Sequence, residues 1–107
     1  MMDQVATLSL ATASIHLDPN QEQIQSGEGL EDQLLRASIR RHGVLEALQV
    51  ATEGRGEGYT IIDGERRFRI AKEMGIDRLV CIVHPAMSRE HRADLRAELR
   101  STVRPAP

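Results

Sequence analysis

Residues 59–74, YTIIDGERRFRIAKEM, constrain the fold most, because an extended segment changes into a helix there without an intervening loop. The run YTII is rich in β-forming residues, and Gly64 follows where the backbone geometry must change. From Glu65 onward, apolar residues recur with the helical period of 3.6. The segment therefore predicts a strand, a glycine and an amphipathic helix in direct succession.

Two arginines in the first turn of this helix are unfavourably placed in the absence of an anion. The helical projection puts Arg67 inside the apolar arc and Arg66 at its edge. A helix N-terminus carries partial positive charge and unpaired N–H groups, and a buried guanidinium also loses its water. A bound anion would remove both penalties. We therefore expect a phosphate-bearing ligand at residues 64–67, GERR.

Acidic residues elsewhere in the chain leave a second explanation open, namely that Arg66 and Arg67 pair with Asp63, Glu65 or an acid from residues 18–32.

The net charge of −2 argues against a domain that coats nucleic acid through its overall field. All 14 basic residues follow position 35, against 10 acidic residues there, so this part of the chain carries +4. A local anion site is compatible with that charge. The chain has one Tyr and one Phe, too few for a platform that stacks nucleic-acid bases.

The length of 107 residues predicts one domain, and the scarcity of aromatic residues predicts an aliphatic core. No apolar run is long enough for a signal peptide or a membrane span, so we expect a cytoplasmic protein.

Cys81 lies in a strand-like apolar run, which favours a buried small hydrophobe over a nucleophile. His16 falls on the polar phase of an alternating segment, which favours a solvent-facing side chain.

The remaining patterns predict an α/β (α+β) fold, with a small mixed sheet and packed helices. The predicted elements are one or two strands before residue 18, a helix at 30–42 closed by Gly43, strands at 44–51 and 79–83, and a peripheral helix at 88–101. A polar loop at 21–29 and a glycine-rich turn at 54–58 connect them.

The strand at 79–83 is continuously apolar, as in strands covered on both faces. With the strand and helix before it, it would form a βαβ-like unit. The arginines of the last helix alternate with acids, which favours a solvated face.

The segment GERRFRIA, preceded by YTIID, resembles the N-terminal domain of the ParB family, within the ParB and sulfiredoxin-like superfamily. ASIRRHGVLEALQV is similar to that family's helix, glycine and strand segment, so the likeness spans about residues 15–84. The resemblance implies that Gly64, Glu65, Arg66 and Arg67 line a nucleotide triphosphate site for CTP or another NTP. It also implies that the loop from Gly43 to Glu46 faces the base.

Members of the family partition plasmids or chromosomes, silence transcription, or have been proposed to be nucleases. The resemblance thus implies a role in DNA partition, with a weak CTPase activity and Mg²⁺ as further expectations. No helix-turn-helix follows in these residues, so DNA would be contacted through other regions or an associated protein. A homodimer and a partition ATPase are the other partners that the resemblance implies.

The chain also departs from the family pattern. Glu46-Ala47 stands where the family usually has Gln-Pro, and Glu22-Gln23-Ile24 replaces the usual Gln-Pro-Arg. The family's later Glu-Asn-x-x-Arg motif, which handles phosphates and metal, is not recognisable. Arg100 to Arg104 are the candidates for a substitute cation.

Three other functions remain open. A metal-dependent nuclease would use Asp63 and Glu65. An interaction module would keep the fold with a degenerate nucleotide site, and would either recruit a partition ATPase or dimerise through its last helix. A sulfiredoxin-like oxidoreductase would need a cysteine where this chain has Glu65.

Overall fold

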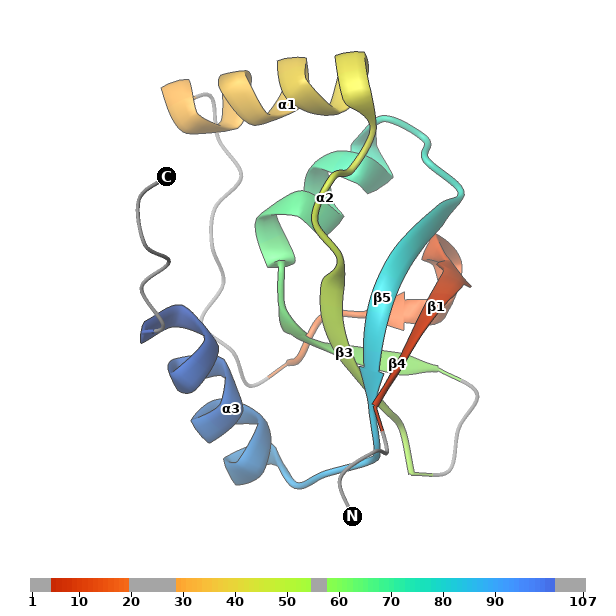
Figure 1. Cartoon of the computed structure of the whole chain (residues 1–107), viewed down its shortest axis with the longest axis vertical. Coiled ribbons are helices and arrows are strands. Elements are labelled where there is room, and N and C mark those ends of the chain that lie inside the picture. The colour runs from red at the N-terminus through yellow and green to blue at the C-terminus, as the bar shows by residue number, and fades with distance from the viewer. Residues whose placement is uncertain (1–4, 20–28, 55–57, 102–107) are drawn as a thin grey trace.

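The computed structural model describes residues 5–19, 29–54 and 58–101, which form one mixed sheet and three α-helices (Figure 1). In chain order the elements are β1 (Ala6–Ala11), the short 3-10 helix η1 (Thr12–Ser14), β2 (Ile15–His16), α1 (Leu30–His42), β3 (Leu48–Thr52), β4 (Tyr59–Asp63), α2 (Glu65–Glu73), β5 (Arg78–His84) and α3 (Arg89–Ser101). The predicted α/β class with a small mixed sheet is confirmed. In the part of the chain that is described, none of the helices is long and apolar enough to cross a membrane.

The strand order of the sheet is β1-β5-β3-β4-β2. Strand β3 lies at the centre, antiparallel to β4 and parallel to β5. The predicted βαβ-like unit of β4, α2 and β5 is wrong, because β3 lies between the two strands and β4 runs against both. The glycine junction nevertheless lies at the carboxyl end of β4. Since β4 is antiparallel to β3, that end is beside the start of β3, where Gln49 pairs with Asp63.

The hydrophobic core fills the space between one face of the sheet and α2. Its fully buried side chains come from all the central elements and include Leu48, Ile61, Phe68, Ile70 and Cys81. The predictions of a largely aliphatic core and of a buried Cys81 are confirmed. His16 is exposed, as its place in the alternation predicted. Val80 is 48% exposed, so β5 is not covered on both faces as its apolar run predicted.

Glycines end or begin helices at the predicted positions. Helix α1 has the predicted bounds, and Gly43 closes it with φ of 79° and a hydrogen bond from its N–H to Ile39 O. Strand β3 starts only at Leu48, four residues later than predicted, because residues 44–47 form a loop, in which Leu45 is exposed. The antiparallel pairing of β3 with β4 agrees with the predicted hairpin. Its turn at 55–57 and the polar segment at 20–28 lie outside the described residues.

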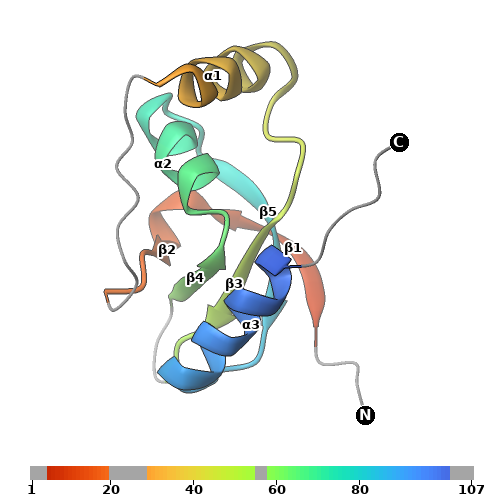
Figure 2. The ribbon, with the colours of Figure 1, turned by 90° about the vertical axis from the view of Figure 1, so that its left-hand side faces the viewer.

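Helix α3 lies beside β4 and runs back toward the carboxyl end of that strand (Figure 2). Ser88 caps it as predicted, with a 3.0 Å hydrogen bond from the N–H of His91 to Ser88 Oγ. No residue of α3 is buried, in agreement with a peripheral helix. The prediction that its arginines form a solvated face is wrong for Arg92 and Arg96. Both turn inward and pair with Asp18, because this buried carboxylate after β2 needs counter-charges.

Candidate functional site

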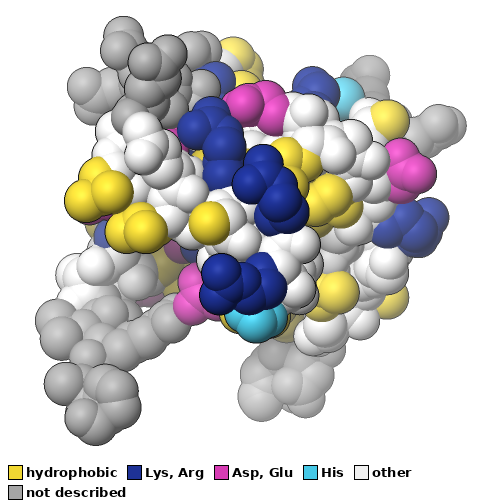
Figure 3. Space-filling view, turned by 90° about the horizontal axis from the view of Figure 1, so that it is seen from above, with side chains coloured by type: hydrophobic (Ala, Val, Ile, Leu, Met, Phe, Trp, Pro, Cys, Tyr) yellow, Lys and Arg dark blue, Asp and Glu magenta, His cyan; other side chains and the backbone are white. Residues whose placement is uncertain are grey.

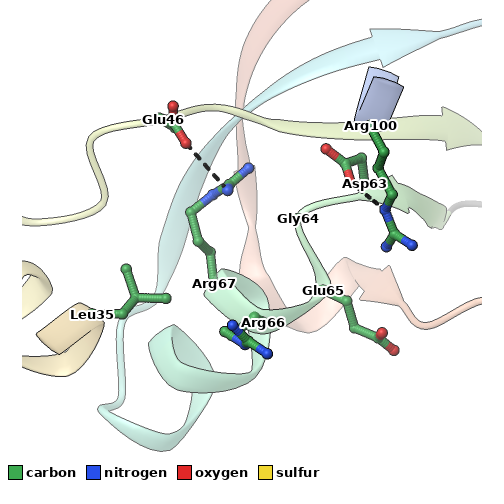
Figure 4. A pocket seen from close by; sticks show the side chains of 8 residues that line it. All are labelled: Leu35, Glu46, Asp63, Gly64, Glu65, Arg66, Arg67 and Arg100. Carbon is green, nitrogen blue, oxygen red and sulfur yellow. Dashed lines mark hydrogen bonds and ion pairs between the residues drawn. The ribbon is translucent and has the colours of Figure 1, made fainter. Parts of the chain in front are cut away.

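A cavity of about 390 Å³ opens at the junction of β4 and α2 (Figure 4). Three further elements border it, because the antiparallel sheet brings the loop before β3 to this point while α1 and the end of α3 close its sides. The lining residues are Leu35, Glu46, Asp63, Gly64, Glu65, Arg66, Arg67 and Arg100.

Gly64 forms the turn from β4 into α2 and keeps the cavity open. Its φ is 109° and its ψ is 21°, in a left-handed conformation that side chains other than glycine rarely adopt. A Cβ here would lie 2.6 Å from Leu48 Cδ2 and 3.0 Å from Arg67 Nη2. No side chain caps α2, so the N–H groups of its first turn have no capping acceptor. The end of the helix at this cavity therefore suits an anion.

Arg66 extends from the first turn of α2 toward the start of α1. Its Nη1 lies 2.8 Å from Glu31 Oε1, and its Nε lies 3.0 Å from Asp32 Oδ1. The internal ion pair that the sequence left open is therefore present for this arginine. Asp32 is buried, whereas Glu31 is largely exposed, so the two carboxylates hold the guanidinium at the rim of the cavity.

Arg67 points across the cavity toward the loop before β3 (Figure 4). Its Nη1 lies 3.3 Å from Glu46 Oε1, and its Nη2 donates to Ala47 O at 3.4 Å. Glu46 lies outside the set of acids that the sequence proposed as partners, because only the sheet brings it here. Arg67 Nε is buried and has no hydrogen-bond partner within the described residues. The arginine therefore has a donor that its internal contacts leave unused.

The two candidate metal carboxylates face arginines. Glu65 is 2% exposed and its Oε2 lies 3.4 Å from Arg69 Nη2, while Asp63 Oδ1 lies 3.3 Å from Arg100 Nε. No group of three or more His, Cys, Asp or Glu that could hold a metal ion occurs among the described residues. The cavity is lined by three arginines and three acids, and each of the three acids lies against an arginine, which disfavours a carboxylate metal centre.

Cys81 lies in the core rather than at this cavity. Its thiol is fully buried, and its Sγ lies 3.6 Å from Leu79 O. Burial raises the pKa of the Cys81 thiol to about 11, since the thiolate would have to exist without water. A reactive thiolate of the kind that a sulfiredoxin-like oxidoreductase needs is not favoured here.

The cavity gathers most of the residues that the sequence singled out. Glu46, Gly64, Glu65, Arg66 and Arg67 all line it, whereas Gly43 caps α1 and does not. The structure adds Leu35, Asp63 and Arg100 to the cavity. Arg100 belongs to the segment considered as a source of a substitute cation. Leu35 lies on the wide apolar side of its helix, and no local signal distinguished it from a core residue.

Arg100 reaches the cavity because its helix is fixed one and two turns earlier, at Arg96 and Arg92. Arg96 donates from Nε to Ile62 O at 2.7 Å, and its Nη2 lies 3.3 Å from Asp18 Oδ2. Arg92 donates to the same carboxylate oxygen at 2.8 Å. These polar contacts take the place of apolar burial, since no residue of α3 is buried.

The fold and the site together define a small mixed α/β domain with an arginine-lined cavity at a helix N-terminus. The family model of the ParB N-terminal domain matches residues 2–100. The chain therefore belongs to the ParB N-terminal domain family, which confirms the resemblance noted from its sequence.

Individual proteins support the same relationship. The chain is 35% identical over 82 residues to the chromosome-partitioning protein Spo0J of Thermus thermophilus, covering 76% of this chain and 29% of that protein. Among solved structures, the truncated ParB of Caulobacter crescentus complexed with CTP-γ-S matches with a TM-score of 0.78 and 20% identity, over 94% of this chain and 56% of that one. Sulfiredoxin of Arabidopsis thaliana matches with a TM-score of 0.59 and 18% identity, over 89% and 98% of the two chains. At these identities the two structures establish a shared fold.

The chain spans less than a third of each curated relative, between 17% and 29% of their lengths. The names of these relatives describe proteins that act in the partitioning of chromosomes or plasmids.

Proposed function

We propose that this domain binds a nucleoside triphosphate, with CTP as the first candidate, in the cavity at residues 64–67. The observation that carries the proposal is the uncapped N-terminus of α2, with the guanidinium groups of Arg66 and Arg67 at the same cavity. Phosphate oxygens are suited to such a site, because helix N–H groups and planar guanidinium forks both donate to them.

The residues present fit a triphosphate on three counts. The volume of about 390 Å³ is within the range of small-molecule sites. Arg67 Nε is a buried donor without a partner in the described residues, which a phosphate oxygen would satisfy. Arg100 adds a third guanidinium from α3, where it now neutralises Asp63. CTP is favoured over other bases because the Caulobacter ParB of the same fold was solved with a CTP analogue.

The internal ion pairs oppose the ligand only weakly. Glu31 and Glu46 are 82% and 49% exposed, so these pairs contribute little and a triphosphate can displace them. Asp32 is buried and would stay with Arg66, orienting its guanidinium toward the cavity. Mg²⁺, if it accompanies the nucleotide, would be held largely by phosphate oxygens. Hydrolysis of CTP would be slow, because the nearby carboxylates of Asp63 and Glu65 are engaged by arginines.

In the cell, we propose that nucleotide binding by this domain serves DNA partition, as the names of the curated relatives suggest. Contacts with DNA would come from other regions or from an associated protein, because the described helices carry mixed charge rather than a continuous basic face.

Calorimetry and thermal unfolding with CTP, ATP, GTP and UTP, each with and without Mg²⁺, test the proposal. A ligand at 100 times its dissociation constant adds about 2.7 kcal/mol, which raises the melting temperature of a domain this size by about 10 °C or more. CTP should give the largest shift. If none of the four nucleotides raises the melting temperature at millimolar concentration, the proposal fails.

A double variant and a matched control locate the site. Arg66→Ala with Arg67→Ala should abolish the shift, because it removes two guanidinium groups from the cavity. Arg89→Ala should leave the shift unchanged, since Arg89 is exposed at the opposite end of α3 from Arg100. Circular dichroism checks that each variant is folded. Equal loss of binding in both would point to a general charge effect and not to this cavity.

A further inference from the structure

A second cavity, of about 380 Å³, lies along α2 beyond the GERR junction. Among the described residues, its lining consists of Leu17, Phe68, Arg69, Lys72 and Glu73. Leu17 comes directly after β2, and the other four residues belong to α2. This Lys72 cavity shares none of these residues with the cavity at the GERR junction. A ligand in it would therefore be separate from the proposed nucleotide.

Two of the lining side chains are apolar and are fixed by the domain. Phe68 is part of the hydrophobic core, and Leu17 is partly buried and packs against that core. Their positions are therefore set before any ligand arrives. A preformed apolar surface favours a ligand with an apolar body, because contact with it requires no further ordering of the protein.

The acid of the Lys72 cavity is neutralised from outside it, whereas Arg69 is only partly satisfied. Arg36 Nη2 on α1 donates to both carboxylate oxygens of Glu73 at 3.1 Å. Arg69 Nη2 lies 3.4 Å from the buried carboxylate of Glu65. Arg69 Nε is buried and has no hydrogen-bond partner within the described residues. The internal contacts of Arg69 are therefore few and long, and its guanidinium can accept a further anion.

Lys72, the only lysine of the chain, supplies a charge without a counter-charge. Its Nζ lies 5.6 Å from the centroid of the Phe68 ring, and no carboxylate pairs with it in the part of the chain that the structure describes. The ammonium group thus lies beside the apolar lining. An anion that carries an apolar group could contact both at once.

We propose that the Lys72 cavity binds a small organic acid with an apolar body. The carboxylate would lie between Lys72 and Arg69, and the apolar body would pack on Leu17 and Phe68. A single cation without a counter-charge suits a monoanion, whereas a triphosphate needs several donors. The volume of about 380 Å³ is within the range of small-molecule sites.

NMR titration of the 107-residue chain with phenylacetate tests the proposal, because this probe joins one carboxylate to one apolar ring. At millimolar probe, the backbone amide signals should shift saturably, with the largest changes at Leu17, Phe68 and Lys72. Phenylacetamide lacks the charge and acetate lacks the apolar body. Each should bind more weakly than phenylacetate by about threefold or more.

A variant of Lys72 and a matched control separate the cavity from a general charge effect. Basic side chains also gather beside apolar ones on the face of the molecule seen in Figure 3. Lys72→Gln should weaken phenylacetate binding by about threefold or more. Arg40→Gln removes an exposed cation from α1 and should leave binding unchanged. Both positions are exposed and glutamine is a good helix former, so circular dichroism should report folded protein.

Three results would overturn the proposal. The first is the absence of saturable shifts. The second is equal binding of phenylacetamide and phenylacetate, which would mean that the cations play no part. The third is a set of shifts confined to Gly64, Arg67 and Arg100, which would place the acid in the cavity at the GERR junction. The titration contains no nucleotide, so its outcome does not depend on whether the domain binds CTP.

Discussion

Arg92 on α3 donates from Nε to the buried carboxylate of Asp18 at 2.8 Å, across 74 residues of sequence. Arg96 lies 3.3 Å from the same oxygen, so one carboxylate holds two guanidinium groups of an otherwise unburied helix. Because Arg100 lies one turn further along α3, this contact determines where the third cationic group of the cavity lies.

Substitution of Asp18 by Asn should destabilise the domain strongly. The Asp18 side chain is 2% exposed, and its loss leaves two partly buried arginines without counter-charge, which costs about 3 kcal/mol. Urea unfolding followed by circular dichroism measures the loss. Asp94→Asn, on the exposed side of the same helix, is the control and should change stability by less than about 0.5 kcal/mol. Similar values for the two variants would mean that Asp18 does not anchor α3.

Substitution of Glu46 by Gln should strengthen binding of CTP. Glu46 lies 3.3 Å from Arg67, and its charge competes with phosphate for that guanidinium. An exposed pair of this kind is worth roughly 0.2–1 kcal/mol, so affinity should rise by a factor of about 1.4 to 5 in calorimetry. Glu90→Gln, exposed in the first turn of α3, should have no effect. Weaker binding by Glu46→Gln would instead mean that this carboxylate contacts the nucleotide itself.

Substitution of Gly64 by Ala should both destabilise the domain and impair the cavity. The backbone has φ of 109°, and the new Cβ would meet Leu48 Cδ2 at 2.6 Å and Arg67 Nη2 at 3.0 Å. The strain should cost about 2 kcal/mol or more in the free energy of unfolding. Gly54→Ala provides the comparison, since nothing lies within 4 Å of its Cβ, and should stay within about 0.5 kcal/mol of the wild type. A Gly64→Ala protein as stable as Gly54→Ala would contradict the left-handed turn.

Cys81 should make stability depend on pH in the alkaline range. Burial raises the pKa of its thiol from 9.0 to about 11, so the folded state keeps a proton that the unfolded state loses. Stability from this group is therefore complete below pH 9 and falls as pH rises toward 11, by about 2–3 kcal/mol. The difference between wild type and Cys81→Ala in urea unfolding at pH 8 and pH 10.5 isolates this effect from other groups. A difference that does not change with pH would show that the thiol titrates normally.

Local signals in the sequence determined where several elements begin and end. Gly43 ends α1, Gly64 starts α2 and Ser88 caps α3, because each residue satisfies a backbone geometry or an unpaired group at its own position. The same kind of signal identified Arg66 and Arg67, since two cations at a helix N-terminus conflict with its dipole. The family also followed from the order of these segments, and the match over residues 2–100 confirms it.

Tertiary structure decided which distant groups meet these residues. Helical periodicity assigned Arg92 and Arg96 to a solvated face, but it contains no information about Asp18, which reaches them only through the fold. The order of the sheet likewise could not be read from β4, α2 and β5 alone, because the strand inserted between them comes earlier in the chain.

The GERR junction combines both levels. Its sequence determined a glycine turn and a cationic helix start, since these depend on neighbouring residues only. Only the fold decided that Arg66 meets Asp32 while Arg67 meets Glu46, because α1 and the loop before β3 reach the cavity through the packing of α1 on α2 and the antiparallel pairing of β3 with β4.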